Sequence, residues 1–582
     1  MEISSIGRPR NVGWLRAAAL LYGDWGTSKA YVIGLAVAGV GFTALPHLLA
    51  VCALTGLVGI NYFWVCKHFP IGGGVYTAAG LHSRRLATVG GLLLLADFIV
   101  TASLSCLDGF HYLGVEEPAT AKKWAISAIF AIGAINFLGP KHTGGVAVWL
   151  AVPTVVVVMM LIAGGSPHIS QFHPQPPSGS VVGNWAAFVG MILALSGVEV
   201  AASSTGVLKL DPGSTLEKPS VFITARRAVW AVMLDVVIGT ALLAVLAMCL
   251  PDAAKGHQND MPRYMAEVFI GPHFANLVGW VFGILLISAV NTAVTGIIAL
   301  LYVMARDGEL PDTFLLLNRF GVPWVGLIAA TILPVVVLNI DDKVEGLAAL
   351  YAIGVVGAIA INLGSCAFAK TIDLKKVERI TMKGTFVVLA AVWITIALSK
   401  LYALLFVAVV LSVGLALREV TSRHRLTAPA TPTLATVVPV VPAPGSPPEF
   451  LGQFILVAAR GWTPALQFAL EESRVRGAQL LVLYIREVAV SIDMGGNWQN
   501  DPDARALFTR LEAEAPGLKV NKLYSVSDSP ADTIIDIAAT FGVDSVVLGG
   551  SRRATLVNLL KGNVVARVAA NLPESMHLIV IG

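Results

Sequence analysis

Long apolar runs separated by short polar stretches fill the first 418 residues of the chain. A helix needs about 20 predominantly apolar residues to cross a bilayer, and this length predicts twelve spanning helices. Their expected bounds are 14–40, 43–66, 86–113, 122–139, 143–164, 184–208, 221–250, 273–305, 322–340, 345–369, 384–400 and 401–418. The pattern therefore predicts an all-α polytopic membrane domain over residues 1–418.

The hydrophobic pattern changes after this domain. Residues 419–449 are rich in proline, which is typical of an extended, semi-rigid linker. Over residues 450–582, short β-branched runs such as QLLVLYI and VDSVVLGG alternate with stretches of helical periodicity. Alternating strands and helices at this spacing predict a parallel sheet covered by helices on both faces. We expect a soluble α/β domain there.

Composition agrees with a membrane protein. Of the 582 residues, 56% are hydrophobic and 13% are charged, and the mean hydropathy is +0.76. A soluble domain carries about a quarter charged residues, so a single water-soluble core is excluded. The net charge of +4 is small and the basic residues are scattered, which predicts no nucleic-acid partner. The five cysteines show no CxxC spacing, so neither a disulfide framework nor a zinc site is indicated.

The loops carry an orientation signal. If the N-terminus faces the cytoplasm, most loop lysines and arginines, such as Arg84, Arg85, Arg226 and Arg227, face the cytoplasm too. Cytoplasmic loops of membrane proteins are enriched in these residues. We therefore predict a multi-pass protein of the cell membrane, in contact with the lipid bilayer, with both termini in the cytoplasm.

Five ionisable residues fall inside predicted spans, where each is costly unless paired or hydrated and is a functional candidate by default. They are Asp24, Lys29, Asp97, Glu199 and Asp235. Asp24 lies in YGDWGTSKAYVIGLA, where glycines and hydroxyls interrupt the first span, and Tyr31 follows seven residues later. An unwound helix at this place frees carbonyl groups for an ion. The alternative is a buried Asp24–Lys29 ion pair that holds a structural kink.

Asp97, Thr101 and Ser105 are spaced i, i+4, i+8, so their side chains form one stripe on the third span. Oxygen ligands on successive turns suit a hard cation. The alternative is that both hydroxyls bond back to their own helix. The sixth span holds a second break, ALSGVEVAASSTG, in which Ser196 is a candidate ligand and Glu199 either relays protons or ties the break together. Asp235 has no partner evident from spacing.

The two broken spans, the first and the sixth, occupy corresponding places in two successive sets of five helices. This arrangement is typical of an inverted-repeat transporter with its site at mid-membrane. It predicts a LeuT-like 5+5 repeat.

The same segments resemble known transporters. YGDWGTSKAYV resembles the first-helix signature of the KUP/HAK/KT potassium uptake family, with Lys29 where that family usually has proline. FPIGGGVY, LLLLADFIVTASLS, LSGVEV, NTAV and LYAIGV resemble segments of KimA-type potassium importers. Those importers belong to the amino acid–polyamine–organocation (APC) superfamily, which has the LeuT-like fold.

The resemblance implies proton-coupled potassium uptake, a symport, with potassium as the substrate. The residues that would line the ion path are Asp24, Tyr31, Asp97, Thr101, Ser105, Ser196 and Tyr351. Asp24, Asp97 and Glu199 would carry the proton. Lys29 departs from the pattern, and its ammonium close to Asp24 would act as an internal cation. The rival is a proton-coupled amino acid or amine permease of the same superfamily.

Residues 450–582 resemble a universal-stress-protein domain, which has a flavodoxin-like sheet. The diagnostic segment is GGSRRATLVNLLKGNVV, and the family's nucleotide site would fall on Gly550, Ser551, Arg552, Arg553, Gly562 and Asn563. Arg553 and Asn563 depart from the usual glycine and serine or threonine, and these departures argue against ATP binding in the usual pose. The resemblance to KimA-type importers implies a homodimer through this domain and inhibition by cyclic di-AMP. The alternative is a dimerisation or folding module with solvated arginines.

No Walker lysine motif, GxSxG or Cys/His pair occurs, so we expect no enzyme and no required cofactor. A sensor that kept the fold without transport is a third class, and flux measurements separate it from a transporter.

Overall fold

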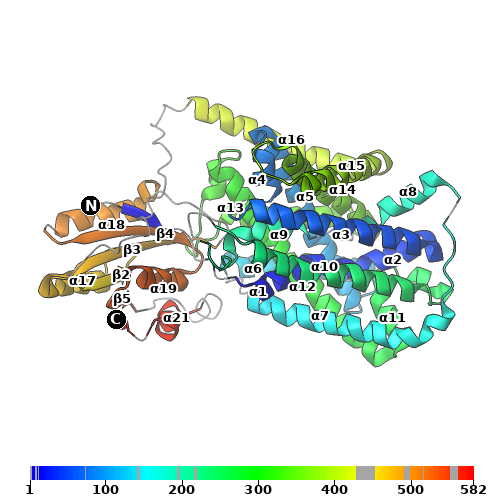
Figure 1. The fold of residues 1–582 in the computed structure, drawn as a ribbon, viewed down its shortest axis with the longest axis horizontal. Coiled ribbons are helices and arrows are strands. Elements are labelled where there is room, and N and C mark those ends of the chain that lie inside the picture. The colour runs from blue at the N-terminus through cyan, green and yellow to red at the C-terminus, as the bar shows by residue number, and fades with distance from the viewer. Residues whose placement is uncertain are drawn as a thin grey trace.

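The computed structural model shows a helical domain followed by an α/β domain (Figure 1). It describes the chain except for the following residues: 1–2, 7–9, 11, 73, 140–143, 178, 193–196, 215–218, 428–452, 490–497, 516, 551–561 and 574.

Helices fill the N-terminal domain. The first half contains α1 (Trp14–Trp25), α2 (Ser28–Val40), α3 (Ala44–His68), α4 (Val75–Gly80), α5 (Arg84–Tyr112), α6 (Pro118–Phe137), α7 (Gly144–Gly165), α8 (Val181–Gly190) and α9 (Glu199–Ser203). The second half contains α10 (Phe222–Ala247), α11 (Met261–Phe269), α12 (Pro272–Arg306), α13 (Trp324–Ile340), α14 (Val344–Phe368), α15 (Lys376–Ser399) and α16 (Leu401–Thr427).

Among the described residues, eight helical stretches are long and apolar enough to cross a membrane. One of them, Trp14–His68, contains α1, α2 and α3, and the shorter apolar helices α8 and α13 fall below the length limit. This result supports a multi-pass membrane protein. The count of twelve spans and the inverted repeat stay predictions. The last helix, α16, continues to Thr427, past the expected start of the linker at residue 419.

Large apolar side chains cover the outside of the helical domain. Trp149, Leu398 and Ile340 are 81%, 80% and 73% exposed. Soluble proteins rarely expose apolar surface on this scale, whereas lipid tails solvate it. The helices turn their small and polar residues inward, and α5 is buried along nearly its whole length. Helix α5 therefore lies at the centre of the helical domain.

The C-terminal domain is a doubly wound parallel sheet. Its strands are β2 (Phe454–Ala458), β3 (Gln479–Glu487), β4 (Val520–Ser527), β5 (Ser545–Gly549) and β6 (His577–Ile581). Its helices are α17 (Pro464–Arg476), α18 (Pro502–Glu514), α19 (Pro530–Phe541) and α21 (Val564–Asn571). Helices α17 and α18 cover one face, α19 and α21 the other. The predicted parallel α/β domain is confirmed.

The N-terminal segment extends this sheet. Strand β1 (Ile3–Ile6) lies parallel to β4, with Ile3 opposite Lys522 and Ile6 opposite Ser525. The full strand order is β1-β4-β3-β2-β5-β6, and Figure 1 shows the N-terminus beside β4. The sequence analysis did not predict this strand. It covers the edge of β4, whose N–H and C=O groups would otherwise be open to pairing with another chain.

A loop of the helical domain also contacts the C-terminal domain. The Ala489 N–H donates to the carbonyl of Gly321 at 2.9 Å. Gly321 has a φ of +78°, and a Cβ there would lie 2.4 Å from the Glu487 carbonyl oxygen. Only glycine allows this approach, because both the backbone angle and the space exclude a side chain. The two domains are thus joined at this loop as well as through β1.

Candidate functional site

The two predicted helix breaks contact each other. Helix α1 ends at Trp25, and α2 begins at Ser28 after a turn at Gly26 and Thr27. Gly197, in the second break, has a φ of +87°, and a Cβ there would lie 2.4 Å from the backbone nitrogen of Trp25. No side chain fits at this position. The missing Cβ lets the second break lie directly against the Asp24–Trp25 backbone and brings Glu199 toward Asp24.

A second close approach adds α14 to the site. A Cβ on Gly354 would lie 3.0 Å from the backbone nitrogen of Asp97. Helix α14 therefore packs tightly on α5 beside Asp97. Tyr351, one turn before Gly354, enters the centre of the site, where the charges of Asp97, Asp24 and Glu199 all act on its hydroxyl.

The three carboxyl groups form one buried cluster. Asp24, Asp97 and Glu199 are 4%, 1% and 3% exposed. The charges of Glu199 and Asp24 both act on Asp97, and the charge of Asp24 acts on Glu199. Two carboxylates this close cannot both stay ionised without a counter-charge, so they share a proton or hold a cation between them.

Several polar atoms in this cluster have no hydrogen-bond partner among the described residues. They are Oδ1 of Asp97, both Oε atoms of Glu199 and the hydroxyl of Tyr351, together with Nε1 of Trp25. Buried polar groups in proteins are nearly always paired. Unused oxygen atoms in a buried cluster of carboxyl groups are the donor set that a proton or hard cation takes.

The hydroxyl groups expected along the ion path differ in their hydrogen bonds. The Tyr31 hydroxyl lies 3.3 Å from that of Thr27, beside the first break. Thr101 donates to the carbonyl of Asp97 at 2.9 Å, as in the alternative in which it bonds back to its own helix. Ser105 is buried on the same face of α5. Ser196 lies outside the described residues.

Lys29 is not placed against Asp24. Its ammonium forms an ion pair with Asp235 of α10 and donates to the Tyr22 hydroxyl at 3.3 Å. Among the described residues this pair replaces the Asp24–Lys29 pair that the sequence left open, and it supplies the partner that Asp235 lacked. Spacing alone does not show it, because the two residues are 206 positions apart. The positive charge of Lys29 is therefore neutralised by Asp235 and not by the carboxyl cluster.

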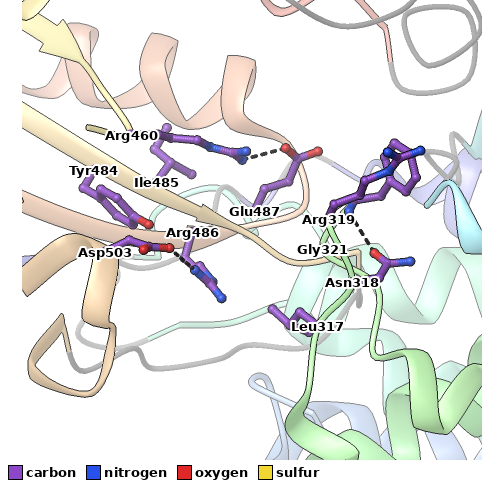
Figure 2. A pocket seen from close by; sticks show the side chains of 11 residues that line it. Leu317, Asn318, Arg319, Gly321, Arg460, Tyr484, Ile485, Arg486, Glu487 and Asp503 are labelled. Carbon is purple, nitrogen blue, oxygen red and sulfur yellow. Dashed lines mark hydrogen bonds and ion pairs between the residues drawn. The ribbon is translucent and has the colours of Figure 1, made fainter. Parts of the chain in front are cut away.

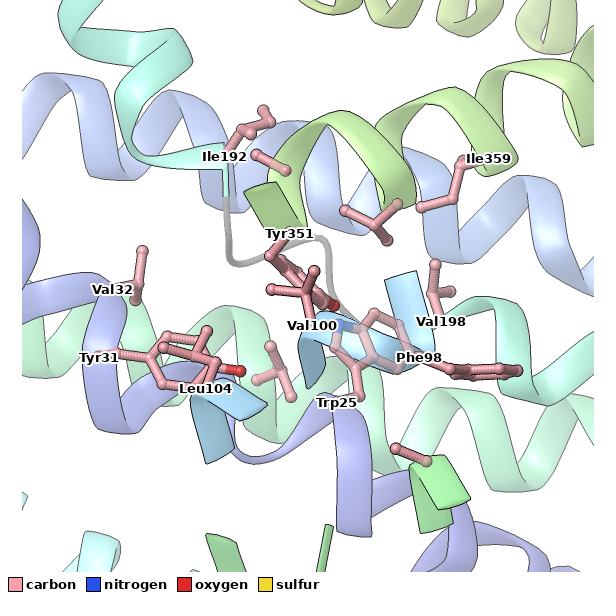
Figure 3. Close-up of a cluster of buried hydrophobic side chains, with 14 of the residues drawn as sticks. Trp25, Tyr31, Val32, Phe98, Val100, Leu104, Ile192, Val198, Tyr351 and Ile359 are labelled. Atoms are coloured by element: carbon pink, nitrogen blue, oxygen red, sulfur yellow. The ribbon is translucent and has the colours of Figure 1, made fainter. Parts of the chain in front are cut away.

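Apolar side chains surround the charged cluster. Trp25, Phe98, Val198 and Tyr351 come together in Figure 3, where the Tyr351 ring points toward the Trp25 indole. All four are buried. Such walls lower the local dielectric and strengthen every charge interaction inside. They also keep bulk water from the carboxyl groups.

The predicted nucleotide segment is described only in part. The Gly550 N–H donates to the Ile581 carbonyl at 2.8 Å, and Gly562 has a φ of +77°. Asn563 caps α21, because its side chain accepts from the N–H groups of Val565 and Ala566. Ser551, Arg552 and Arg553 lie outside the described residues.

A cavity of about 300 Å³ lies where the two domains meet (Figure 2). Arg319 and Phe320 line it from the helical domain, and Arg460, Arg486 and Glu487 from the C-terminal domain. Arg460 pairs with Glu487 at 2.6 Å, and Arg486 pairs with Asp503 at 3.2 Å. Burial raises the pKa of the Tyr484 phenol in its wall. The pairs neutralise two of its three arginines.

Asp108 is a buried charged residue that was not among the candidates expected from the sequence. It is fully buried near the end of α5. Its position eleven residues after Asp97 is close to three turns of 3.6 residues. Extending the Asp97–Thr101–Ser105 stripe by one more turn finds it.

Broken helices around a buried, negatively charged cluster in a helical membrane domain define the class of multi-pass membrane transporters. The chain belongs to the amino acid permease family, whose profile matches residues 12–426. The universal stress protein family matches residues 457–579.

The relatives differ in what their names say they transport. The potassium transporter KimA of Bacillus subtilis is 24% identical over 59% of this chain and 58% of its own length. An uncharacterized amino-acid permease of Schizosaccharomyces pombe is 27% identical over 36% of this chain and 44% of its own length. The L-asparagine permease of Escherichia coli is 22% identical over 39% of this chain and 46% of its own length. The chain thus spans about half the length of these relatives.

Proposed function

We propose that the protein is a secondary active transporter that takes up a monovalent cation, potassium, together with protons. The observation that carries this proposal is the buried cluster of Asp24, Asp97 and Glu199, with unused oxygen atoms on Asp97 and Glu199 and with Lys29 paired to Asp235 instead. Such a cluster attracts positive charge and repels the carboxylate of an amino acid. The similarity to a potassium transporter supports the same reading.

The proposed path uses the residues that line the two breaks and α5. Asp24, Tyr31, Asp97 and Tyr351 supply oxygen atoms to the cation, with Thr101, Ser105 and Ser196 along the same path. The Asp97–Glu199 pair exchanges the coupled proton, because one shared proton relieves the repulsion between them. A LeuT-like 5+5 arrangement of twelve helices provides the alternating access.

The test is rubidium uptake into proteoliposomes with and without an inward proton gradient. We compare the wild type with Asp24→Asn and use Asp252→Asn as the matched control, because Asp252 lies in an exposed turn with an 83% exposed side chain. Losing one charged ligand costs about 1.5–3 kcal/mol, which is about a 10- to 100-fold loss of affinity. We expect that loss for Asp24→Asn and none for Asp252→Asn.

The second candidate is a proton-coupled amino acid or amine permease, which the family and two of the relatives favour. Absence of rubidium uptake by correctly folded wild type, with uptake of labelled amino acids or amines, would replace the first proposal by this one. An amine fits the cluster better than a zwitterion, because Asp24 attracts its ammonium group.

We also propose that the C-terminal domain regulates transport, forms a homodimer and takes a nucleotide, cyclic di-AMP or ATP, near Gly550, Gly562 and Asn563. The termini would then face the cytoplasm. Titration calorimetry of the purified full chain with each nucleotide tests the ligand, light scattering tests the dimer, and labelling of an engineered cysteine in intact cells tests the side. If neither nucleotide gives a binding heat, the C-terminal domain is a dimerisation or folding module without a nucleotide ligand.

A further inference from the structure

Asp108 is an ionisable residue that the central cluster does not use. Its side chain is completely buried in α5, and neither carboxyl oxygen has a hydrogen-bond partner among the described residues. An ionised carboxyl group in such a place is strongly disfavoured. Asp108 is therefore neutralised by a proton when no positive charge lies beside it.

The surroundings of Asp108 show a route by which a proton reaches it. Asp260, which directly precedes α11, exerts its charge on Asp108. Asp260 is about a quarter exposed and pairs with His257 at 3.0 Å, and His257 is about one third exposed. This pair gives the buried carboxyl group a polar neighbour that reaches water. In Figure 1, α11 lies at the end of the helical domain away from the sheet.

The other groups around Asp108 come from neighbouring elements. On α5 itself His111 and Tyr112 follow, and the Tyr112 hydroxyl donates to the Ala30 carbonyl of α2 at 2.6 Å. From α11, Arg263 lies over Gly114 and Gly279. Helix α12 contributes backbone and apolar atoms, with the Gly283 carbonyl 3.2 Å from the Cβ position of Gly109. The negative charge of Asp260 favours a proton on Asp108 over an ionised carboxylate.

Asp108 also lies on the same face of α5 as Asp97. Eleven residues separate them, which is about 16 Å along the helix axis. Thr101 and Ser105 lie between them on this face. The face thus runs from a carboxyl group near the outer end of the domain to the carboxyl pair at its centre.

We propose that Asp108 is a second proton-binding site, which takes up the coupled proton from the side of the membrane opposite to the C-terminal domain. The carboxylate of Asp108 accepts a proton that enters past Asp260 and His257, and releases it toward the Asp97–Glu199 pair. The inference rests on the proposed proton-coupled transport. It adds a separate proton acceptor outside the cation site.

The experiment compares wild type, Asp108→Asn, Asp260→Asn and the control Asp252→Asn in proteoliposomes. Two fluxes are measured: rubidium uptake driven by a proton gradient, and rubidium–rubidium exchange without a gradient. For Asp108→Asn we expect at least a tenfold loss of the gradient-driven uptake, with exchange within about twofold of wild type. The control should match wild type in both, since its exposed ion pair has little energetic weight.

For Asp260→Asn the proposal predicts the direction in which the pH dependence of uptake shifts. Removing the neighbouring negative charge lets Asp108 ionise more readily, so the proton leaves at lower pH. The half-maximum of gradient-driven uptake should shift to lower pH. A shift in the other direction would contradict the proposal.

Two results would overturn the proposal. The first is unchanged gradient stimulation and pH dependence in Asp108→Asn. The second is an equal loss of exchange and gradient-driven uptake in folded Asp108→Asn, which would place Asp108 in the cation site itself. Folding is checked by size-exclusion chromatography and thermal unfolding.

An infrared measurement separates this inference from the proposed function. If wild type transports no rubidium, the proposed function fails, and the protonated-carboxyl band still reports on Asp108. We expect the difference spectrum between wild type and Asp108→Asn to contain that band near neutral pH. Its absence would refute the second proton site whatever the substrate is.

Discussion

The ion pair between Lys29 and Asp235 predicts that removing one partner destabilises the protein more than removing the other. It joins α2 to α10, outside the carboxyl cluster, and Tyr22 accepts a further hydrogen bond from the lysine. The two partners differ in burial. The Lys29 side chain is 0% exposed, whereas that of Asp235 is 17% exposed.

The magnitude follows from this difference. Removing one partner of a buried pair costs about 3–5 kcal/mol, because it leaves the other charge uncompensated. Asp235→Asn leaves a fully enclosed ammonium group, so its cost should fall within this range. Lys29→Met leaves a carboxylate that keeps some access to solvent, and we expect about 1–2 kcal/mol, the cost of an unsatisfied polar group. The double variant Lys29→Met/Asp235→Leu removes both charges, and such replacements are often neutral.

The assay is the thermal midpoint of the purified full chain in detergent, followed by intrinsic fluorescence. Because a two-domain membrane protein does not unfold in two states, the rank order is the test. We expect Asp235→Asn to be the least stable, Lys29→Met to lie between, and the double variant to approach wild type. Asp252→Asn, which breaks only an exposed pair, is the control.

Two results would refute this reasoning. One is a Lys29→Met variant less stable than Asp235→Asn, which would mean that the buried lysine is not the costlier charge. The other is a double variant no more stable than Asp235→Asn, which would mean that the two charges are not coupled.

Three further predictions follow from contacts. Gly197→Ala should destabilise the helical domain by about 2–5 kcal/mol, through backbone strain and overpacking against Trp25, and lower rubidium uptake; Gly190→Ala, which has open space, is the control, and equal behaviour of the two would contradict the close approach. Deleting residues 1–7 should raise hydrogen exchange at the β4 amides that face β1, and unchanged exchange would contradict the pairing. The buried Lys522 ammonium holds the pKa of Glu512 below its usual range. The ion pair therefore stabilises the folded state above the ordinary glutamate pKa, and this stabilisation is lost as the pH falls through the folded-state pKa. Glu512→Gln should reduce the fall of the thermal midpoint at acid pH, and an unchanged fall would contradict the prediction.

Much of the site was accessible from the sequence, because its signals are local. A charge inside an apolar run is visible without any structure, and glycines beside Asp24 and Glu199 mark the two breaks. Periodicity places Asp97, Thr101 and Ser105 on one face of α5. Asp108 was missed only because the stripe was not extended by one more turn.

The partners of these residues were not accessible. Lys29 was expected near Asp24, five residues away, and instead reaches Asp235, 206 positions along the chain. No periodicity relates such residues, because their contact depends on how α2 packs against α10. The added strand β1 is a similar case, since a short N-terminal segment carries no signal that it will pair with β4.

The amino-acid sequence by itself determined the division into a helical part and an α/β part, the long apolar helices of the first, the parallel sheet of the second and the positions of the costly charges; it did not indicate the short helices α4 and α11. Each depends on hydrophobicity and spacing within about 20 residues. The tertiary structure alone decided that the two breaks touch at Gly197, that Asp97 and Glu199 lie in one buried cluster with Asp24, that Lys29 pairs with Asp235 and that β1 joins the sheet. These depend on backbone approach between distant segments, which is set by the packing of the whole domain.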